Sequence, residues 1–275
     1  MAVNKNDQNL EDFFAKHPVF ILAEFAAWYG FRHAVGARTV ETILFYHTRR
    51  GRLVRVRRGF YAVVPAGSRA ASLPVDPFLL AAKMTDDAVL AYHTALEFHG
   101  KAHTVTQEFL YLTKRAARPF TFRGQRFQGL SIPPALRVKK AEHFGVVTAD
   151  RMGLDVRVTS LERTMVDVLD RPQFGGGWEE IWRSLESVEF FDLDAVIEYT
   201  LLLGNATTVA KVGFFLEQHK GALMVEDKHL ERLRAHRPRE PHYLSRRDRK
   251  AGKLVSGWNL IVPSEVLERR WQEIL

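Results

Sequence analysis

The segment from Arg49 to Val64 constrains the fold more than any other part of the chain. Its first ten positions hold six arginines, and an Arg-Arg-Gly sequence at 57–59 separates two runs rich in β-branched and aromatic residues. Such runs on either side of a glycine turn predict a β-hairpin. Strict alternation along the first run would place Leu53 on one face with Arg55 and Arg57, and Arg52, Val54 and Val56 on the other.

The residues just before this hairpin, 36–50, have a helical period. Val40, Ile43, Leu44 and His47 recur at helical spacing and are expected to face a core, which leaves Arg38, Thr39, Thr42, Tyr46 and Arg49 facing outward. A helix followed by a basic hairpin is the order of a winged helix-turn-helix, in which the helix enters the major groove and the hairpin lies against phosphates or the adjacent groove. Upstream, the apolar stretch 19–29 predicts a buried helix that Gly30 can end, and 9–16 predicts a short leading helix.

Positive charge is concentrated in the same region. Residues 32–58 contain eight arginines and one acid, Glu41, a net charge of +7, whereas the whole chain carries +8. Local positive density of this kind provides much of the affinity for nucleic acid through counterion release, although surface arginines can also form a merely solvated face. We predict that residues 1–66 bind double-stranded DNA through Arg38, Thr39, Thr42, Tyr46, Arg49, Arg50, Arg52, Arg55, Arg57 and Arg58.

A second basic concentration lies near the end of the chain. Residues 228–253 hold ten Lys or Arg and three acids, again +7, whereas residues 59–227 hold 18 basic and 21 acidic side chains. This secondary basic patch could clamp one duplex from a second side, or it could be a solvated loop. Its members are Arg246, Arg247, Arg249, Lys250 and Lys253. The apolar run 258–263 after it predicts a closing strand, which would place the basic stretch inside a domain.

The length of the chain and the position of its proline-containing segment predict two domains. Residues 67–76 have the small residues and prolines of a linker, which leaves 77–275 as a larger C-terminal domain. Strand-like runs followed by helical ones make that domain mixed α/β (α+β). We expect helices at 77–83, 88–98, from Ser160, and at 178–187, 193–202, 207–219 and 227–233, with strands at 104–113, 120–122, 126–132 and 156–158.

Composition excludes several classes of protein. The chain has no cysteine, so it has no disulfide, thiolate metal site or cysteine nucleophile. No apolar run approaches the roughly 20 residues of a membrane span, and the polar N-terminus lacks the core of a signal peptide. We therefore expect a soluble, cytoplasmic protein with no membrane partner.

Motifs for catalysis are missing from the sequence. It contains no Walker loop, dinucleotide-binding fingerprint or nucleophile elbow, and we predict no catalytic residue, no metal site, no cofactor and no enzymatic activity. The triple glycine 175–177 before Trp178 could cradle a phosphate, but a turn that requires positive φ is the simpler interpretation.

Clusters of titratable residues also have structural interpretations. His93 and Glu97 share a helix face whereas His99 is rotated away, which favours packing over a zinc site. The carboxylates Glu162, Asp167 and Asp170 are explained by ion pairs with Arg163 and Arg171. Asp155 lies in a segment faintly similar to a nuclease metal strand, but the lysine of such a site is missing.

Four blocks of the sequence resemble the AbiEi-type antitoxins, predicted transcriptional regulators of abortive-infection and viral-defence systems. The hairpin block at 51–61 is similar to the wing signature of that family. The resemblance continues in Ala-Tyr-His-Thr-Ala-Leu at 91–96, in Val-Thr-Ser-Leu-Glu-Arg-Thr-Met-Val-Asp at 158–167, which is the most specific block, and in Trp-Asn-Leu at 258–260. Together the blocks span nearly the whole chain.

This resemblance implies an antitoxin of a type IV toxin-antitoxin pair. Its winged helix would repress its own operon at inverted repeats, and its larger C-terminal domain would act against a nucleotidyltransferase toxin without a stable complex. The family pattern maps DNA contact onto the helix positions Arg38, Thr39 and Thr42 and the wing positions Arg55, Arg57 and Arg58. His47 departs from the pattern, in which an aliphatic side chain is expected, and the basic segment after Lys228 can be particular to a subgroup.

Two alternatives from other classes remain open. One is a stand-alone transcriptional regulator whose C-terminal domain senses a ligand. The other is a nuclease targeted by a winged helix, for which Asp155 would be the residue to test.

Overall fold

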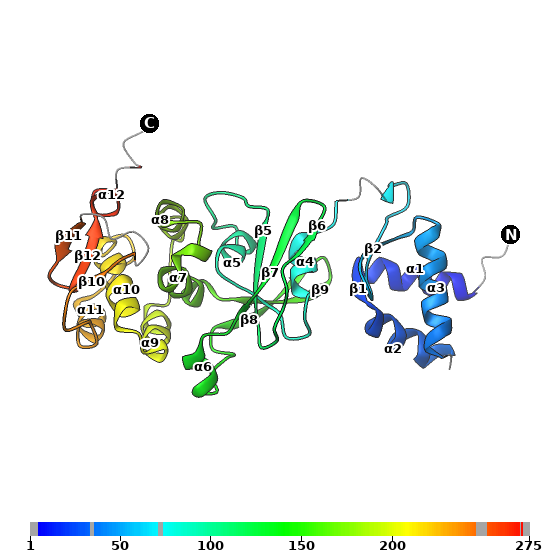
Figure 1. The fold of residues 1–275 in the computed structure, drawn as a ribbon, viewed down its shortest axis with the longest axis horizontal. Helices are drawn as coiled ribbons and strands as arrows, with labels where there is room; N and C mark the ends of the chain where they lie inside the picture. Colours follow the sequence, from blue (N-terminus) through cyan, green and yellow to red (C-terminus); the bar gives the residue numbers. More distant parts are fainter. Residues whose placement is uncertain (1–4, 34–35, 71–73, 246–251, 270, 272–275) are drawn as a thin grey trace.

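The chain is organised as a row of layers along its longest axis (Figure 1). The computed structural model describes residues 5–33, 36–70, 74–245, 252–269 and 271. Over these residues it is a mixed α/β structure, as expected from the sequence, with a three-stranded N-terminal sheet, a six-stranded central sheet and a three-stranded C-terminal sheet. Helices α1–α3 lie at the outer side of the N-terminal sheet, α4 lies between that sheet and the central sheet, and most of the other helices lie between the central and C-terminal sheets (Figure 1).

In the described part of the chain, the N-terminal layer contains three helices and the first sheet. Its sheet has the strand order β1-β3-β2 with antiparallel pairing throughout. The elements are α1 (Lys5–Lys16), β1 (Val19–Ile21), α2 (Leu22–His33), α3 (Ala37–Arg49), β2 (Leu53–Arg57) and β3 (Phe60–Val63). The sequence-based prediction of one helix over 19–29 was wrong at its start, because Val19–Ile21 pairs with β3, and at its end, because α2 continues through Gly30.

The central layer is a mixed sheet of order β6-β7-β5-β4-β9-β8. Its elements are α4 (Pro77–Ala82), β4 (Val89–Leu90), α5 (His93–Phe98), β5 (Glu108–Thr113), β6 (Phe120–Phe122), β7 (Gln125–Ser131), α6 (Pro134–Val138), β8 (Val146–Arg151) and β9 (Leu154–Thr159). The predicted helix over 88–98 is in fact strand β4 followed by α5, and the chain turns between them at Tyr92, which has φ +57°. Strand β8 was not predicted.

The C-terminal layer is mainly helical. It contains α7 (Leu161–Asp170), a 3-10 turn η2 (Pro172–Phe174), α8 (Trp178–Glu186), α9 (Leu193–Leu203), α10 (Ala206–Gln218), α11 (Asp227–Arg234), β10 (His242–Tyr243), β11 (Gly252–Val255), β12 (Leu260–Pro263) and α12 (Ser264–Leu267). Polar caps define the starts of several helices, and the Ser160 hydroxyl, as expected, accepts from the Arg163 amide at the start of α7. No helix among the described residues is long and apolar enough to cross a membrane.

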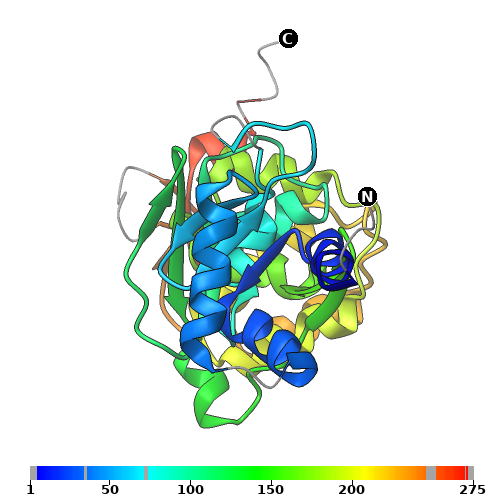
Figure 2. The same ribbon diagram turned by 90° about the vertical axis from the view of Figure 1, so that its right-hand side faces the viewer.

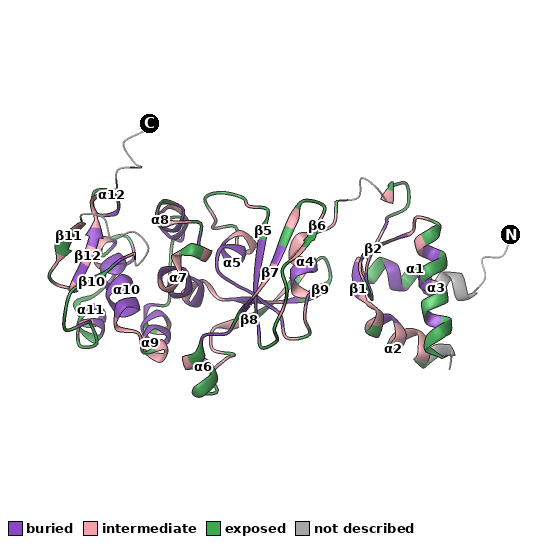
Figure 3. Ribbon diagram, viewed as in Figure 1, coloured by how far each residue is buried: buried purple, intermediate pink, exposed green. Residues whose placement is uncertain are grey.

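Both faces of the central sheet are buried at its middle strands, β4 and β5. Along β5, Phe109 and Tyr111 belong to a core shared with α4 and the N-terminal sheet, whereas Leu110 and Leu112 belong to a core shared with α5 and α7–α11. Successive side chains of a strand point to opposite faces, so this one apolar run serves two cores. Figure 3 shows the resulting band of buried residues across the middle of the molecule.

The N-terminal sheet is also buried on both faces. Phe20, Leu53 and Tyr61 pack against α1–α3, and their alternating neighbours, such as Val19 and Phe60, pack against α4 and the central sheet. Lys83 after α4 adds an ion pair with Glu24 of α2. The first domain, residues 1–66 in the sequence-based division, therefore packs directly against the following one.

The predicted linker, 67–76, is described in part. Residues 71–73 lie outside the described residues, and Asp76 caps α4 and forms an ion pair with Arg151.

In the C-terminal layer, Gly213 of α10 packs tightly against the ring of Trp258. The indole is fully buried, and its Nε1 donates to Glu217 at 2.7 Å. A Cβ added at Gly213 would lie 2.2 Å from the ring atoms of Trp258. The glycine is thus required by packing, although its φ is that of an ordinary helix.

We expect Gly213→Ala to lower the free energy of unfolding by about 1 to 2 kcal/mol. Overpacking costs about 1 to 3 kcal/mol, which exceeds the roughly 0.5 to 1 kcal/mol that alanine gains over glycine inside a helix. Urea unfolding of both proteins measures the difference. Gly221→Ala is the matched control, because a Cβ at Gly221 meets nothing within 4 Å. Equal stability of the Gly213 variant and the wild type would contradict the packing argument.

Candidate nucleic-acid interface

Helix α3 divides into a buried and an exposed face as its sequence predicts. Val40, Leu44 and His47 are buried, and Ile43 is partly buried against the same N-terminal core. The imidazole ring of His47 lies near two aromatic rings. Its centroid is 5.5 Å from the ring centroid of Phe14 and 5.3 Å from that of Tyr46. The histidine that departs from the family pattern is therefore an ordinary member of this small core.

The opposite face of α3 is open to solvent. Figure 2 looks at the N-terminal end of the molecule and shows α3 in front, running across it. The predicted contact residues on this helix are all exposed, namely Arg38, Thr39, Thr42, Tyr46 and Arg49, together with Arg50 at its C-cap. Phe45, which the sequence analysis did not select, is 62% exposed on the same helix.

Two arginines at the end of α3 are stacked on its aromatic side chains. The guanidinium carbon of Arg49 lies 5.5 Å from the Phe45 ring centroid, and that of Arg50 lies 4.5 Å from the Tyr46 centroid. Stacking of this kind is worth roughly 0.5 to 1 kcal/mol at an exposed site. It holds the charged groups close to the helix surface and lowers the entropy that they lose when they bind a partner.

The N-terminal hairpin, β2–β3, contains an irregularity that changes which way its arginines point. The register pairs Arg55 with Tyr61 but Arg57 with Phe60, so a β-bulge lies between Arg55 and Arg57. Residues paired across a sheet share a face. Arg55 therefore lies on the face of Tyr61 and Arg57 on the face of Phe60. The strict alternation that placed Arg55 and Arg57 together was wrong, because a bulge adds one residue to one strand.

The predicted hairpin contacts consequently fall into two groups. Arg55 and Arg58 are exposed and form no hydrogen bond or ion pair with another described residue. Arg57 donates to the Met84 carbonyl, and its guanidinium carbon lies 6.0 Å from the ring centroid of Phe120. Arg52 forms an ion pair with Glu11 and lies 5.5 Å from the Phe14 centroid.

A basic segment that the sequence analysis overlooked lies beside this hairpin. Residues 114–126 hold five Lys or Arg and no acid, within a stretch whose overall charge is negative. The segment includes β6, the edge strand of the central sheet, which lies on the side of the N-terminal layer (Figure 1). Arg118 is exposed, and Arg123 donates to the Ala70 carbonyl. A charge count over shorter windows would have found it.

The secondary basic patch is described only in part. Arg246, Arg247, Arg249 and Lys250 lie outside the described residues. Lys253 is in β11, where it is exposed and its Nζ lies 3.3 Å from Glu268 Oε1. The expected closing strand is present as β12, paired with both β10 and β11.

His93, Glu97 and His99 take part in packing and hydrogen bonding, as expected, and not in one common site. His93 is buried between two carboxylates, with Nδ1 3.0 Å from Glu97 Oε1 and Nε2 3.1 Å from Glu180 Oε1. The ring of His99 contacts the Thr159 carbonyl at 2.8 Å. Glu180 also accepts from the Thr104 amide and hydroxyl, so the cluster connects α5 to α8. The spacing of residues along the chain does not indicate that Glu180 contacts His93.

The carboxylates of α7 also form hydrogen bonds or ion pairs. Asp167 is buried, accepts from Arg163 at 3.3 Å and from the Tyr199 hydroxyl at 2.7 Å, and Asp170 lies 3.7 Å from Arg171. These two predicted ion pairs are confirmed, whereas Glu162 instead accepts from the Asp192 amide. Asp155 is exposed on β9. Among the described residues, no group of three or more His, Cys, Asp or Glu is placed to hold a metal ion.

Comparison with known proteins gives a likeness of fold. No protein-family model matches the sequence, and no curated protein matches it. The structure is similar to the crystal structure of the Rv2827c protein from Mycobacterium tuberculosis, with a TM-score of 0.63 and 17% sequence identity. The match covers 98% of this chain and 96% of that one. What the two proteins share is the mixed α/β fold over nearly their whole length.

The cluster around His93 gives the stability of the protein a defined pH dependence. Burial lowers the pKa of His93, but its hydrogen bonds and charge interactions with Glu97 and Glu180 outweigh burial and raise that pKa. For Glu180, burial raises the pKa, and the hydrogen bonds from Thr104, Ser184 and His93 outweigh it and lower that pKa. The histidine thus stabilises the fold fully below its unfolded pKa of about 6.5, and this contribution is lost as the pH rises through the higher folded value.

We expect His93→Gln to destabilise the protein most below about pH 6.5, by roughly 1.5 to 3 kcal/mol for the lost charge-assisted contacts. The difference from wild type should shrink as the pH is raised toward 9, because wild-type His93 loses its charge. Urea unfolding at a series of pH values measures it, with the exposed His143→Gln as control. A difference that stayed constant from pH 6 to 9 would mean that folding does not raise the pKa of His93.

Proposed function

We propose that the N-terminal layer is a winged helix that binds double-stranded DNA. The order α1-β1-α2-α3-β2-β3 and the sheet order β1-β3-β2 suit this assignment. In such a domain the third helix enters the major groove and the hairpin lies along the backbone. The observation that carries the proposal is the uncovered face of α3, which presents arginine, threonine and aromatic side chains beside the exposed tip of a basic hairpin.

In this proposal the arginines of the hairpin have different roles. Arg55 and Arg58 contact phosphates, because both are exposed and bound to no other described residue. Arg57 and Arg52 position the domain, since binding to DNA would require them to leave the Met84 carbonyl and the Glu11 carboxylate. Base contacts come from the N-terminal part of α3, around Arg38, Thr39 and Thr42, which is where recognition helices meet base edges.

The biological role that we propose follows from the resemblance to AbiEi-type antitoxins. The protein would repress its own operon at inverted repeats through the winged helix, and residues 77–275 would antagonise a nucleotidyltransferase toxin without a stable complex. The uncovered α3 supports the DNA-binding part of this role. A stand-alone regulator that senses a ligand is the second candidate, favoured by a cavity beside Trp178.

We expect the Arg55→Ala/Arg58→Ala double variant to bind DNA with a smaller dependence on salt. Loss of two phosphate contacts should lower the slope of log K against log salt concentration by about two. Fluorescence anisotropy on the DNA upstream of the gene, across a salt series, measures the slope. Arg57→Ala should keep the wild-type slope.

The matched control for this measurement is Arg137→Ala/Lys140→Ala. It removes the same charge from exposed positions in α6 and just after it, away from the N-terminal layer (Figure 1). If the control lowered the slope as much as the double variant does, binding would follow net charge and the proposed interface would be abandoned.

Arg38→Ala should reduce sequence selectivity. A direct base contact contributes about 1 to 3 kcal/mol of discrimination, so the ratio of affinities for upstream and scrambled DNA should fall by roughly five- to 150-fold. Competition binding at one fixed salt concentration measures this ratio. Equal weakening on both DNAs would instead assign Arg38 to the phosphates.

A further inference from the structure

The exposed face of α3 has an apolar centre. Arg38, Thr42, Phe45 and Arg49 recur at i, i+4, i+7 and i+11, so they form one row along the helix. All four are exposed, and they lie opposite the residues of α3 that pack into the N-terminal core. An arginine stands at each end of the row, with a threonine and a phenylalanine between them. The face that would enter a groove is thus charged at its ends and apolar in the middle.

Phe45 supplies most of this apolar surface. It is 62% exposed, and it does not belong to the N-terminal core that the buried side of α3 helps to form. Single apolar side chains are common on protein surfaces. This one differs from them in its position, because it lies at the centre of the row and has the Arg49 guanidinium stacked on its ring. The fold leaves the rest of the ring free for a partner.

Thr42 adds a methyl group to the same centre. Its hydroxyl donates to the Arg38 carbonyl at 2.8 Å, a bond inside the helix itself. The side chain can therefore offer a partner its methyl group and the lone pairs of its oxygen, but no free proton. Guanine presents only acceptors in the major groove. Neither Thr42 nor Phe45 has the donor that contact with guanine would require.

The surrounding charges indicate that the partner of this face is DNA. Arg38 and Arg49 flank the apolar centre, and Arg55 and Arg58 are exposed on the neighbouring hairpin. Phosphates line both sides of a DNA groove, whereas the 5-methyl group of thymine is an apolar group on the floor of the major groove. A surface that is positive around an apolar centre is complementary to a major groove that contains thymine.

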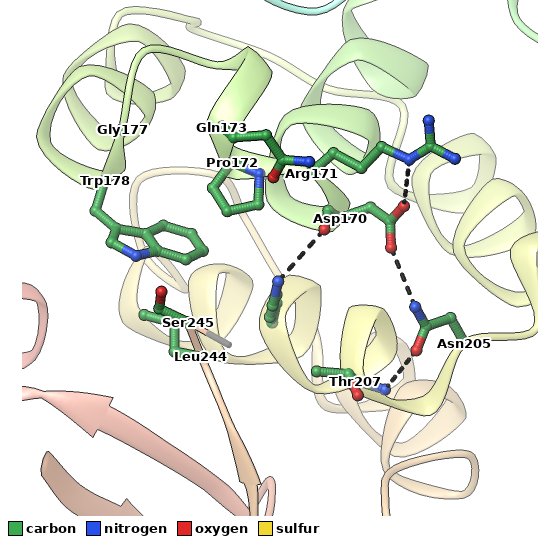
Figure 4. A pocket seen from close by; sticks show the side chains of 11 residues that line it. Asp170, Arg171, Pro172, Gln173, Gly177, Trp178, Asn205, Thr207, Leu244 and Ser245 are labelled. Atoms are coloured by element: carbon green, nitrogen blue, oxygen red, sulfur yellow. Dashed lines mark hydrogen bonds and ion pairs between the residues drawn. The ribbon is translucent and has the colours of Figure 1, made fainter. Parts of the chain in front are cut away.

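The charge in the C-terminal layer is engaged differently. A cavity of about 520 Å³ lies beside Trp178, and its size is within the roughly 300 to 1,000 Å³ of small-molecule sites (Figure 4). The glycines at 176 and 177 have φ of +87° and +99°, so the triple glycine before Trp178 is a turn that needs positive φ, as the sequence predicts. Lys211 in this cavity donates to the carbonyl oxygens of Leu169 and Asp170, at 3.0 and 3.5 Å. Its charge is bound within the protein, whereas the arginines of α3 face solvent.

We propose that Phe45, together with the methyl group of Thr42, recognises thymine by covering its 5-methyl group in the major groove. Phenylalanine and the threonine methyl group are side chains that make this contact, and the methyl group distinguishes thymine from the other three bases. This recognition rests on the proposed DNA binding by the N-terminal layer. It extends the base contacts beyond the first turns of α3 and places A·T pairs under the middle of the helix.

Replacement of thymine by deoxyuridine tests the proposal, because it removes the 5-methyl group and keeps every hydrogen-bonding group of the base. The probes are the DNA upstream of the gene and a scrambled DNA, each prepared with thymine and with uracil, and fluorescence anisotropy at one fixed salt concentration measures binding. We expect the wild type to bind upstream uracil DNA more weakly, by about fourfold for each methyl group that it contacts. Scrambled DNA should show no such difference.

Three variants locate the effect. Phe45→Ala should bind upstream thymine and uracil DNA equally, whereas Phe45→Leu keeps an apolar side chain and should retain a preference for thymine of about twofold. Phe190→Ala is the matched control, because it removes a phenylalanine that is 65% exposed in the C-terminal layer, and it should behave as the wild type. Since Phe45 and Phe190 are both exposed, the melting temperatures of these variants should stay within a few degrees of wild type.

Three outcomes would overturn thymine recognition. The first is selective binding by the wild type with equal affinity for upstream thymine and uracil DNA, which leaves the proposed DNA binding intact. The second is a preference for thymine that persists in Phe45→Ala. The third is a smaller sedimenting species for free Phe45→Ala than for the free wild type, which would assign Phe45 to a contact between copies of the chain. Wild-type protein that does not distinguish upstream from scrambled DNA would overturn the proposed function as well.

Discussion

The arrangement of the whole molecule depends on burial of the N-terminal sheet on both faces. One face packs on α1–α3, and the other packs on α4 and the central sheet. An antiparallel sheet in a small domain needs only one buried face to fold. The second buried face means that the domain does not swing on a flexible linker, and the direction of α3 relative to the rest of the chain is set by an apolar contact.

This contact has consequences for the proposed interface. The bulge in β2 turns Arg57 toward the central sheet. Its guanidinium donates to the Met84 carbonyl and lies near the rings of Phe60 in β3 and Phe120 in β6. A charged side chain is thereby used to fix the domain and is withdrawn from the exposed surface. The same contact brings the edge strand β6, which lies within the basic segment 114–126, beside the N-terminal hairpin.

The part of the molecule from α5 to α10 buries several charged groups, each with identifiable partners. His93 lies between two glutamates, Arg163 between Asp167 and two carbonyl oxygens, and Lys211 against the end of α7. Buried charges are tolerated only when paired or hydrogen-bonded, so these contacts constrain how the helices meet. Lys211 differs from the other two, because it borders a cavity large enough for a ligand.

The sequence by itself determined the features that depend on neighbouring residues. Helix α3 with its two faces, the turn of the N-terminal hairpin, the Ser160 cap and the mixed α/β class follow from periodicity, glycine and capping chemistry, all of which act over a few residues. Only the tertiary structure decided that Val19–Ile21 is a strand, that Arg57 turns inward, that Glu180 joins His93, and that Trp178 and Lys211 share a cavity. Each of these depends on residues that are distant in the chain, whose meeting is set by the packing of layers and leaves no local pattern.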